Sequence, residues 1–373
     1  MCLTKRISTK RLLRILVFIT ILTACSQKET QFFIFTRRDP ITGNLSYYKT
    51  DLFNPSYVEN LGSIQCVSGD ARIYPVWSPN GEYYGCSAGQ GCCTVVYDQP
   101  LVIYDANNKV IAELEQEDLE NPLAWQILDW SPDSQYVSIM HTGSKKIPYF
   151  DFSIMKYDGS SLLQIDKQTD VNSSFDGNWS PNGKYIVRQI HLTSSNHNYL
   201  VVSSPSGEEV IRLDLVEFIN TPLVTASNLT WSPDSKKIAF YTGSVYVADT
   251  SSELYVLNIE SEKLTNVTLD NSICIMSISG WAPDNKNILF NAINCESSRY
   301  DPQAHAAYYF INVDNSMLKQ ITEQGYGVLN LTPDGKFIIA NKYPHKGLYI
   351  MDIDGSNERQ LLEDGIFVSW ITP

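Results

Sequence analysis

Short apolar runs rich in β-branched and aromatic residues alternate with polar turn signals along almost the whole chain. Six times, such a run follows a near-copy of one turn, Trp-Ser-Pro-Asp-Gly, and the first residues of these copies are 53, 49, 52, 50 and 50 positions apart. The copies begin at Trp77, Trp130, Trp179, Trp231, Trp281 and Leu331. A fixed period of this length is typical of a solenoid, a propeller or an array.

Each period contains three apolar runs and leads into a fourth. In the period that starts at Trp231, residues 238–242 follow the turn, residues 254–261 come next, and residues 263–268 are the third run. Pro presets φ for the second position of a type I turn, and Gly tolerates the left-handed conformation that closes a hairpin. Four short antiparallel strands of this kind form one blade of a β-propeller. We label them A, which ends at the Trp, then B, C and D.

The two ends of the chain complement each other. The first strand-like runs, within residues 32–62, fit strands B, C and D without an A, whereas residues 365–373 fit an A strand alone. Joined in one blade, they would close the ring and leave no exposed sheet edge. We therefore predict an all-β, seven-bladed β-propeller over residues 32–373, with a six-bladed ring and one distorted repeat as the alternative. The repeated Trp side chains are expected to pack between adjacent blades.

A different pattern precedes the repeats. Five basic residues come before and within the start of a short apolar run, LRILVFITIL, which ends in Leu22-Thr23-Ala24-Cys25. The run is too short to span a bilayer. Its last four residues match a bacterial lipobox, whose Cys thiol receives a diacylglycerol. We expect residues 1–24 to be a lipoprotein signal peptide, Cys25 to be lipidated and residues 25–31 to be a tether. An ordinary signal peptide and a signal anchor are the alternatives.

Charge narrows the choice of partners. The chain has 28 Lys and Arg against 41 Asp and Glu, a formal net charge of −13. Loss of residues 1–24 would change this charge to −18, because the segment holds five basic and no acidic residues. Such a domain repels nucleic acid and anionic membrane surfaces. We therefore expect no nucleic-acid partner, and membrane attachment through the lipid alone.

Cysteine usage fits an exported protein. With Cys2 removed and Cys25 lipidated, six cysteines remain, and an even number favours disulfides. Cys274 and Cys295 lie on either side of one turn, nearly opposite each other on strands A and B, and we predict a bridge between them. The other four cluster in blade two and allow three pairings, which stay open: Cys66, Cys86, Cys92 and Cys93.

The candidate binding residues belong to the connections between strands B and C, which open on one face of a propeller beside the channel mouth. We predict that all five His lie in these B–C connections. His141 and His191 have nearly matching positions in consecutive blades. A metal- or polyanion-binding rim is one interpretation, and ordinary polar loop residues are the other. Long loops on a rigid scaffold often carry binding residues, and Arg and Tyr are enriched at interfaces. The candidate rim comprises His141, His191, His305, His345, Arg299 and Tyr300, with His197 as the fifth His.

Two apparent motifs have plainer explanations. Residues 85–89 match the G-x-S-x-G nucleophile elbow around Ser87, but the residues that follow cannot form the helix that the elbow needs. Residues 352–358 resemble a calcium loop, but they stand at a C-to-D turn that the other blades build from different residues. We therefore assign no catalytic residue.

The repeat resembles the TolB-type propeller family. The segments WSPDSKKIAFYT, from Trp231, and LYIMDIDGSNERQLLEDG, from Leu348, are close to that family's consensus. The resemblance covers about residues 31–373 and implies the propeller fold. The repeat is also similar to those of prolyl-peptidase-like and oligogalacturonate-lyase-like propellers. No partner or site residue is carried over, because TolB has six blades and an added α/β domain, and no His here aligns with the lyase metal site.

These patterns favour a lipid-anchored, extracytoplasmic propeller of the cell envelope, at the outer membrane or the cell surface. We expect a binding module or scaffold without a cofactor, which presents its B–C and D–A loops to an envelope protein or a glycan. The alternative is a metal-assisted, lyase-like enzyme acting on carbohydrate, with a divalent metal at the channel mouth. An enzyme should show a compact cluster of His with Asp or Glu, and a binder a broader patch of Tyr and Arg. The sequence does not indicate an oligomeric state.

Overall fold

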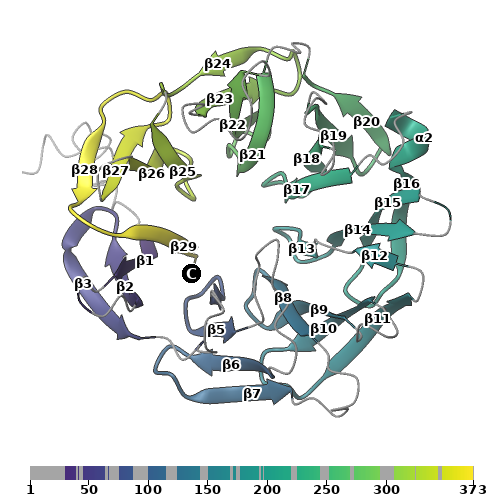
Figure 1. The fold of residues 1–373 in the computed structure, drawn as a ribbon, viewed down its shortest axis with the longest axis horizontal. Coiled ribbons are helices and arrows are strands. Elements are labelled where there is room, and N and C mark those ends of the chain that lie inside the picture. Colours follow the sequence, from purple (N-terminus) through teal and green to yellow (C-terminus); the bar gives the residue numbers. More distant parts are fainter. Residues whose placement is uncertain are drawn as a thin grey trace, which may run out of the picture.

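The chain forms a ring of seven sheets around a central axis in a computed structural model (Figure 1). The described residues are 30–38, 41, 45–63, 66, 75–86, 100–114, 124–142, 150–168, 171–173, 177–192, 195, 197–219, 225–243, 252–268, 273–294, 306–323, 325–342 and 347–372. The signal peptide and the lipidation site that the sequence predicts lie outside these ranges, so both stay predictions.

Blade one joins the two ends of the chain. Its strand order is β29-β1-β2-β3, and β29 (Ile366–Ile371) pairs with β1 (Phe32–Arg38) in antiparallel register. The predicted closure by an A strand from the C-terminal end is therefore confirmed, and the count is seven blades rather than six. Closure of this kind matters physically because β29 pairs with β1, which would otherwise be an exposed sheet edge.

The other strands follow in chain order, one blade after another. Blade one also holds β2 (Leu45–Asp51) and β3 (Asn54–Gly62). Blade two comprises β4 (Val76–Trp77), β5 (Tyr83–Cys86), β6 (Leu101–Asp105) and β7 (Val110–Leu114); blade three β8 (Ala124–Trp130), β9 (Tyr136–Thr142), β10 (Phe150–Lys156) and β11 (Leu162–Gln168); and blade four β12 (Val171–Ser173), β13 (Asn178–Trp179), β14 (Ile186–Leu192), β15 (His197–Ser203) and β16 (Glu209–Asp214). Blade five comprises β17 (Thr225–Trp231), β18 (Lys237–Gly243), β19 (Leu254–Asn258) and β20 (Lys263–Asn266); blade six β21 (Ile273–Trp281), β22 (Asn287–Asn294), β23 (Ala307–Asn312) and β24 (Leu318–Gln320); and blade seven β25 (Tyr326–Leu331), β26 (Phe337–Lys342), β27 (Leu348–Asp352) and β28 (Arg359–Leu362).

Blade four departs from the common pattern. Its strand A is divided into β12 and β13, both of which pair with β14. A short helix, α2 (Leu215–Ile219), follows its last strand. The sequence pattern predicted neither feature, since both depend on the connection into and out of one blade rather than on the repeat.

The repeated turns have the geometry that their residues require. The fifth residue of each turn has a φ between 58° and 70°, the left-handed region, in the set Gly81, Ser134, Gly183, Ser235, Asn285 and Gly335. In five turns the Ser or Thr hydroxyl at the second position accepts a backbone N–H five residues later at 2.9–3.0 Å. Each turn therefore closes its hairpin through local bonds, which explains why the sequence signal is so regular.

The blades are held together by apolar side chains and by Trp. Seven clusters of buried residues each lie between two consecutive blades. The indole N–H of Trp130 donates to the carbonyl of Val76 in the preceding blade at 3.0 Å, and Trp231 and Trp281 make the same contact with Asn178 and Thr230. The predicted packing of Trp between blades is thus confirmed.

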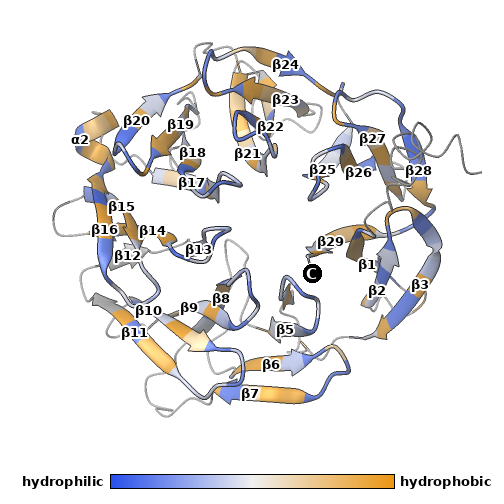
Figure 2. Cartoon of the chain, turned by 180° about the vertical axis from the view of Figure 1, so that it is seen from behind, coloured by the Kyte–Doolittle hydropathy of each residue, from blue (hydrophilic) through white to orange (hydrophobic). Residues whose placement is uncertain are grey.

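The antiparallel order gives the ring two chemically different ends. The A–B and C–D turns lie at one end, which we call the turn end, and the B–C and D–A connections lie at the other, the loop end. Figure 2 shows the ring from behind, with apolar residues distributed along the strands of every blade. Because strands B and C run between the two ends, the position of a residue along the strand determines which end it lies near.

Candidate functional site at the loop end

A buried histidine–carboxylate pair lies at the loop end of blade three. Trp125, His141 and Asp151 are direct partners across strands β8, β9 and β10, so that their side chains leave the same face of the sheet. His141 Nε2 lies 3.1 Å from Asp151 Oδ2, and the His141 ring packs on the Trp125 ring with 4.6 Å between centroids. The Asp151 side chain is 3% exposed and that of His141 is 14% exposed.

This arrangement can orient an imidazole. A carboxylate that contacts one ring nitrogen fixes the tautomer and the ring plane, which is how such pairs prepare His for proton transfer or for metal ligation. In the part of the chain that the structure describes, no group of three or more His, Cys, Asp and Glu side chains comes together to hold a metal. The pair therefore provides orientation without a complete set of described ligands.

His141 and His191 do not occupy matching positions. Counted from the turn, Tyr136 of blade three corresponds to Tyr185 of blade four, because each donates its N–H to the turn Ser hydroxyl. His141 is then five residues on and His191 six residues on. Since successive strand residues point to opposite faces, the two imidazoles leave opposite faces of their blades, and a binding rim that includes both stays a prediction. Partial burial lowers the pKa of His191.

A second histidine–carboxylate pair lies in blade four. His197 Nδ1 is hydrogen-bonded to Asp214 Oδ2, and Asp214 Oδ1 also accepts the N–H of Val216 at 2.9 Å, at the start of α2. His197 stacks on Tyr199 with 6.0 Å between ring centroids. This pair links strand C to the end of strand D, so the His197 imidazole makes its hydrogen bond within its own blade.

Tyr199 also carries a cation on its ring. The Arg212 guanidinium lies 5.2 Å from the ring centroid of Tyr199, and Glu209 holds Arg212 through two contacts of 2.6 and 3.0 Å. The Arg212 side chain is 38% exposed. We call His197, Tyr199 and Arg212 the Tyr199 surface.

A comparable surface lies at the loop end of blade seven. Lys342 Nζ lies 5.0 Å from the ring centroid of Tyr326 and 5.7 Å from that of Tyr349. Glu358 pairs with Lys342 at 2.8 Å and is hydrogen-bonded to the Tyr326 hydroxyl. The Glu358 carboxylate raises the pKa of Lys342, which therefore stays cationic at neutral pH. Aromatic rings that carry a partly exposed cation recur, then, at separate blades of this end.

Sequence reasoning located some of these residues and missed others. It singled out His141, but it missed Asp151, Asp214 and the Tyr199 surface. It also placed the His side chains in the B–C connections, whereas His141 and His191 lie on strand B and His197 begins strand C. The predicted rim residues outside the described ranges are His305, His345, Arg299 and Tyr300, and they remain untested.

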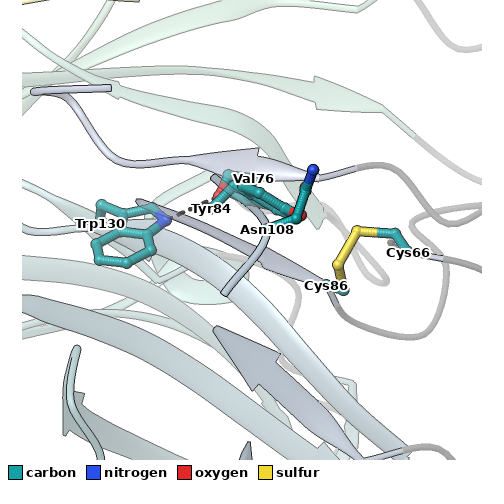
Figure 3. Close-up of a disulfide and its surroundings, with 6 residues drawn as sticks. All are labelled: Cys66, Val76, Tyr84, Cys86, Asn108 and Trp130. Carbon is teal, nitrogen blue, oxygen red and sulfur yellow. Dashed lines mark hydrogen bonds between the residues drawn. A yellow bond between two sulfur atoms is a disulfide. The ribbon is translucent and has the colours of Figure 1, made fainter. Parts of the chain in front are cut away.

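The structure shows part of the disulfide pairing. Cys66, just after β3, is bonded to Cys86 at the end of β5, with 5.3 Å between their Cα atoms (Figure 3). This selects one of the three pairings that the sequence left open. Cys274 is disulfide-bonded. Cys295, Cys92 and Cys93 lie outside the described residues, so the predicted Cys274–Cys295 bridge stays a prediction.

The calcium-like segment forms an ordinary hairpin turn. The N–H of Gly355 donates to the Asp352 carbonyl at 2.9 Å, and Asp354 accepts both the N–H and the hydroxyl of Ser356. Its carboxylate is thus occupied by the turn, in agreement with the hairpin interpretation.

Comparisons with known proteins agree on the fold. No family model matches the chain, and no curated protein matches it. Among solved structures, it is similar to the tricorn protease (TM-score 0.54, 13% identity, 90% of this chain and 35% of that one) and to a structure from an analysis of two prolyl endopeptidases (0.59, 11%, 91% and 49%). It is also similar to an oligogalacturonate lyase in complex with manganese (0.54, 12%, 83% and 82%).

These likenesses extend to architecture alone, since all three identities are well below 25%. The chain spans about a third of the tricorn protease and about half of the prolyl endopeptidase chain. What it shares with all of them is the ring of blades. By its fold, this chain is a seven-bladed β-propeller.

Proposed function

We propose that this protein is a lipid-anchored, extracytoplasmic binding module or scaffold of the bacterial envelope. It acts without catalysis and presents its loop end to an envelope protein or a glycan. The TolB-type resemblance of the repeat and the lipobox at Cys25 support the location, and the acidic charge argues against nucleic acid.

The Tyr199 surface is the observation that carries this proposal. Tyr and Arg side chains supply large contact areas with directed polar groups, and they dominate the binding energy of many interfaces. Here the cation lies on the ring and is held by Glu209, so that little side-chain entropy remains to be lost on binding. Lys342 with Tyr326 and Tyr349 adds a second patch of the same chemistry at the same end of the ring.

Membrane attachment in this proposal is through the diacylglycerol on Cys25. Within the described residues, no helix has the length and apolar character needed to cross a bilayer.

One observation favours a second candidate, a metal-assisted enzyme acting on carbohydrate. The His141–Asp151 pair has the orientation chemistry that such a site uses, and one structural neighbour is a lyase in complex with manganese. The described side chains do not supply the three or more ligands that a metal site needs. We therefore derive no reaction step through a metal here.

Binding measurements with the soluble form lacking residues 1–25 test the first proposal. We expect an envelope protein, found by crosslinking, or a glycan to bind saturably. The double variant Tyr199→Ala with Arg212→Ala should weaken that binding at least tenfold. Arg359→Ala is the matched control, because Arg359 is an exposed arginine of another blade that does not belong to the Tyr199 surface, and its loss should not change the affinity. Unchanged affinity of the double variant would contradict the proposal.

Thermal shift with divalent cations and acidic oligosaccharides tests the second candidate. A ligand that prefers the native state raises the melting temperature. A saturable rise that His141→Ala abolishes, together with cleavage of the oligosaccharide, would establish the enzyme and displace the scaffold.

A further inference from the structure

The described chain enters the ring at the turn end. The carbonyl of Gln31 accepts the N–H of Leu52 at 2.8 Å. The same bond recurs in other blades at 2.8–3.1 Å, where the acceptor is always the residue that ends the A–B turn: Glu82, Gln135, Lys236, Lys286 and Lys336. Gln31 therefore stands where an A–B turn would end, and the segment that leads back to Cys25 leaves from this end.

A contact with blade seven supports this position. The pKa of Asp334, in the A–B turn of blade seven, is lowered although burial opposes the shift, and a hydrogen bond from Gln31 is among the causes. The Gln31 side chain thus lies against a neighbouring turn, which holds the start of the tether at the turn end.

Exposed apolar side chains also gather at this end. Strand D starts at the C–D turn, and at the start of strand D several blades expose a large apolar side chain between 37% and 67%. This set is Val110, Leu162, Leu163, Val210, Met317 and Leu318. The coloured ribbon in Figure 2 shows apolar stretches on β7, β11 and β24. Among the described residues, the loop end exposes fewer such side chains, namely Ile41, Phe218 and Ile366.

The length of the tether limits which end of the ring can face the bilayer. Six peptide units separate Cys25 from Gln31, so the tether reaches at most about 20 Å. A seven-residue strand such as β9 or β14 spans six intervals of about 3.3 Å, so the two ends of the ring are about 20 Å apart. With the loop end against the bilayer, the tether would have to lie fully extended along the whole height of a blade to reach the membrane, whereas with the turn end against the bilayer it needs no such extension.

We propose that the turn end of the ring faces the bilayer surface and that the loop end points away from it. This inference rests on the proposed lipid anchor at Cys25. The occupant of the turn end is the lipid surface to which the chain is anchored through the diacylglycerol on Cys25, and the exposed apolar side chains at the starts of strands D lie on the side of the ring that faces it. The Tyr199 surface and Lys342 then face the opposite side, where a partner from another layer of the envelope can reach them.

Energy transfer from the protein to the membrane tests this orientation. The full-length lipoprotein is purified, Cys25 lipidation is verified by mass spectrometry, and the protein is reconstituted in phosphatidylethanolamine–phosphatidylglycerol vesicles whose headgroups carry an acceptor dye. A donor dye is attached through a bio-orthogonal amino acid at Ser206 or at Ser195. These are a matched pair, because both are exposed serines of blade four, the first at the turn end and the second at the loop end.

We expect the transfer efficiency from Ser206 to be at least twice that from Ser195. Equal transfer, or stronger transfer from Ser195, with Cys25 lipidated overturns the orientation and leaves the anchor standing. Absence of the diacylglyceryl group on Cys25 overturns the orientation together with the anchored location in the proposed function. The two failures are thus distinguishable.

Discussion

The carboxylate of Asp129 accepts the backbone N–H of Trp179 at 2.9 Å, across the boundary between blades three and four. Its other oxygen accepts the N–H of Trp130 at 2.8 Å. Burial raises the pKa of Asp129 to about 6, against the opposing effect of these two hydrogen bonds. A titratable group therefore links two blades beside the Trp that ends strand A.

Asp129 should make stability depend on pH between about 4 and 6. A folded pKa above the unfolded value means that the protonated form favours the fold, so its contribution is present below about pH 4 and is lost as the pH rises to 6. Asp129→Asn cannot titrate. We expect the unfolding free energy of the wild type to fall relative to the variant, by an amount on the order of 1–3 kcal/mol over this range. Urea unfolding at several pH values measures it, and parallel curves for the two proteins would contradict it.

The indole hydrogen bond of Trp231 should stabilise the ring measurably. Trp231→Phe removes the donor to the Asn178 carbonyl and leaves that acceptor unsatisfied, at a cost of about 1–2 kcal/mol beyond lost packing. Trp179→Phe is the matched control, since Nε1 of Trp179 is buried without a hydrogen-bond partner among the described residues. Chemical denaturation of both variants compares the two losses. Equal losses would show that packing alone accounts for the Trp.

The disulfide between Cys66 and Cys86 closes a loop with a sequence separation of 20 residues. In the chain-entropy model, a loop of this length stabilises the fold by about 3 kcal/mol, because it restricts the unfolded chain. We expect the double variant Cys66→Ala with Cys86→Ala to unfold at a lower temperature by several degrees. Calorimetry under non-reducing conditions measures the change. A melting temperature equal to that of the wild type would contradict the assigned stabilisation.

Two turn glycines with nearly the same φ should differ in their tolerance of a side chain. A Cβ at Gly335 would lie 2.1 Å from Pro283 Cδ, whereas a Cβ at Gly183 would lie 3.9 Å from the atom nearest to it. Gly183→Ala therefore carries mainly the backbone cost of the left-handed region, roughly 1 kcal/mol. Gly335→Ala adds an overlap that the Pro283 ring must move to relieve. In thermal unfolding, the melting temperature of Gly335→Ala should be lower than that of Gly183→Ala. The reverse order would contradict the geometry.

The His141–Asp151 contact should show energetic coupling. In a double-mutant cycle with His141→Ala and Asp151→Ala, we expect a coupling free energy of about 1 kcal/mol or more at pH 6, since a buried contact of this type is shielded from solvent. Additive losses in the cycle would show that the two side chains act independently, and the pair would no longer be a candidate site.

The fold was predictable because its signals are local. The period of the turns, the φ requirement at Gly81 or Gly335 and the lone A strand at residues 365–373 can each be recognised from a few neighbouring residues. The candidate site was only partly predictable. His141 stands out by residue type, but its contact with Asp151 depends on the register of two strands joined by a connection between residues 142 and 150. No local pattern specifies that register.

The same limit explains the two other differences. A shift of one residue relative to the turn puts His191 on the opposite face from His141, and such a shift is invisible in a comparison of spacings. The pairing of Cys66 with Cys86 depends on how closely the chain after β3 approaches the end of β5, a distance of 5.3 Å between Cα atoms that only the folded ring brings about.

By itself, then, the sequence determined the blade and predicted the closure of the ring, because turn chemistry and apolar alternation act over a few residues and repeat; the choice of seven blades over six came from the folded ring. The tertiary structure decided which side chains meet: His141 with Asp151, Arg212 with Tyr199, and Gln31 with the turn of blade seven. These contacts join residues on different strands or different blades. Their geometry follows from strand register and from the packing of one blade on the next, which are properties of the whole ring.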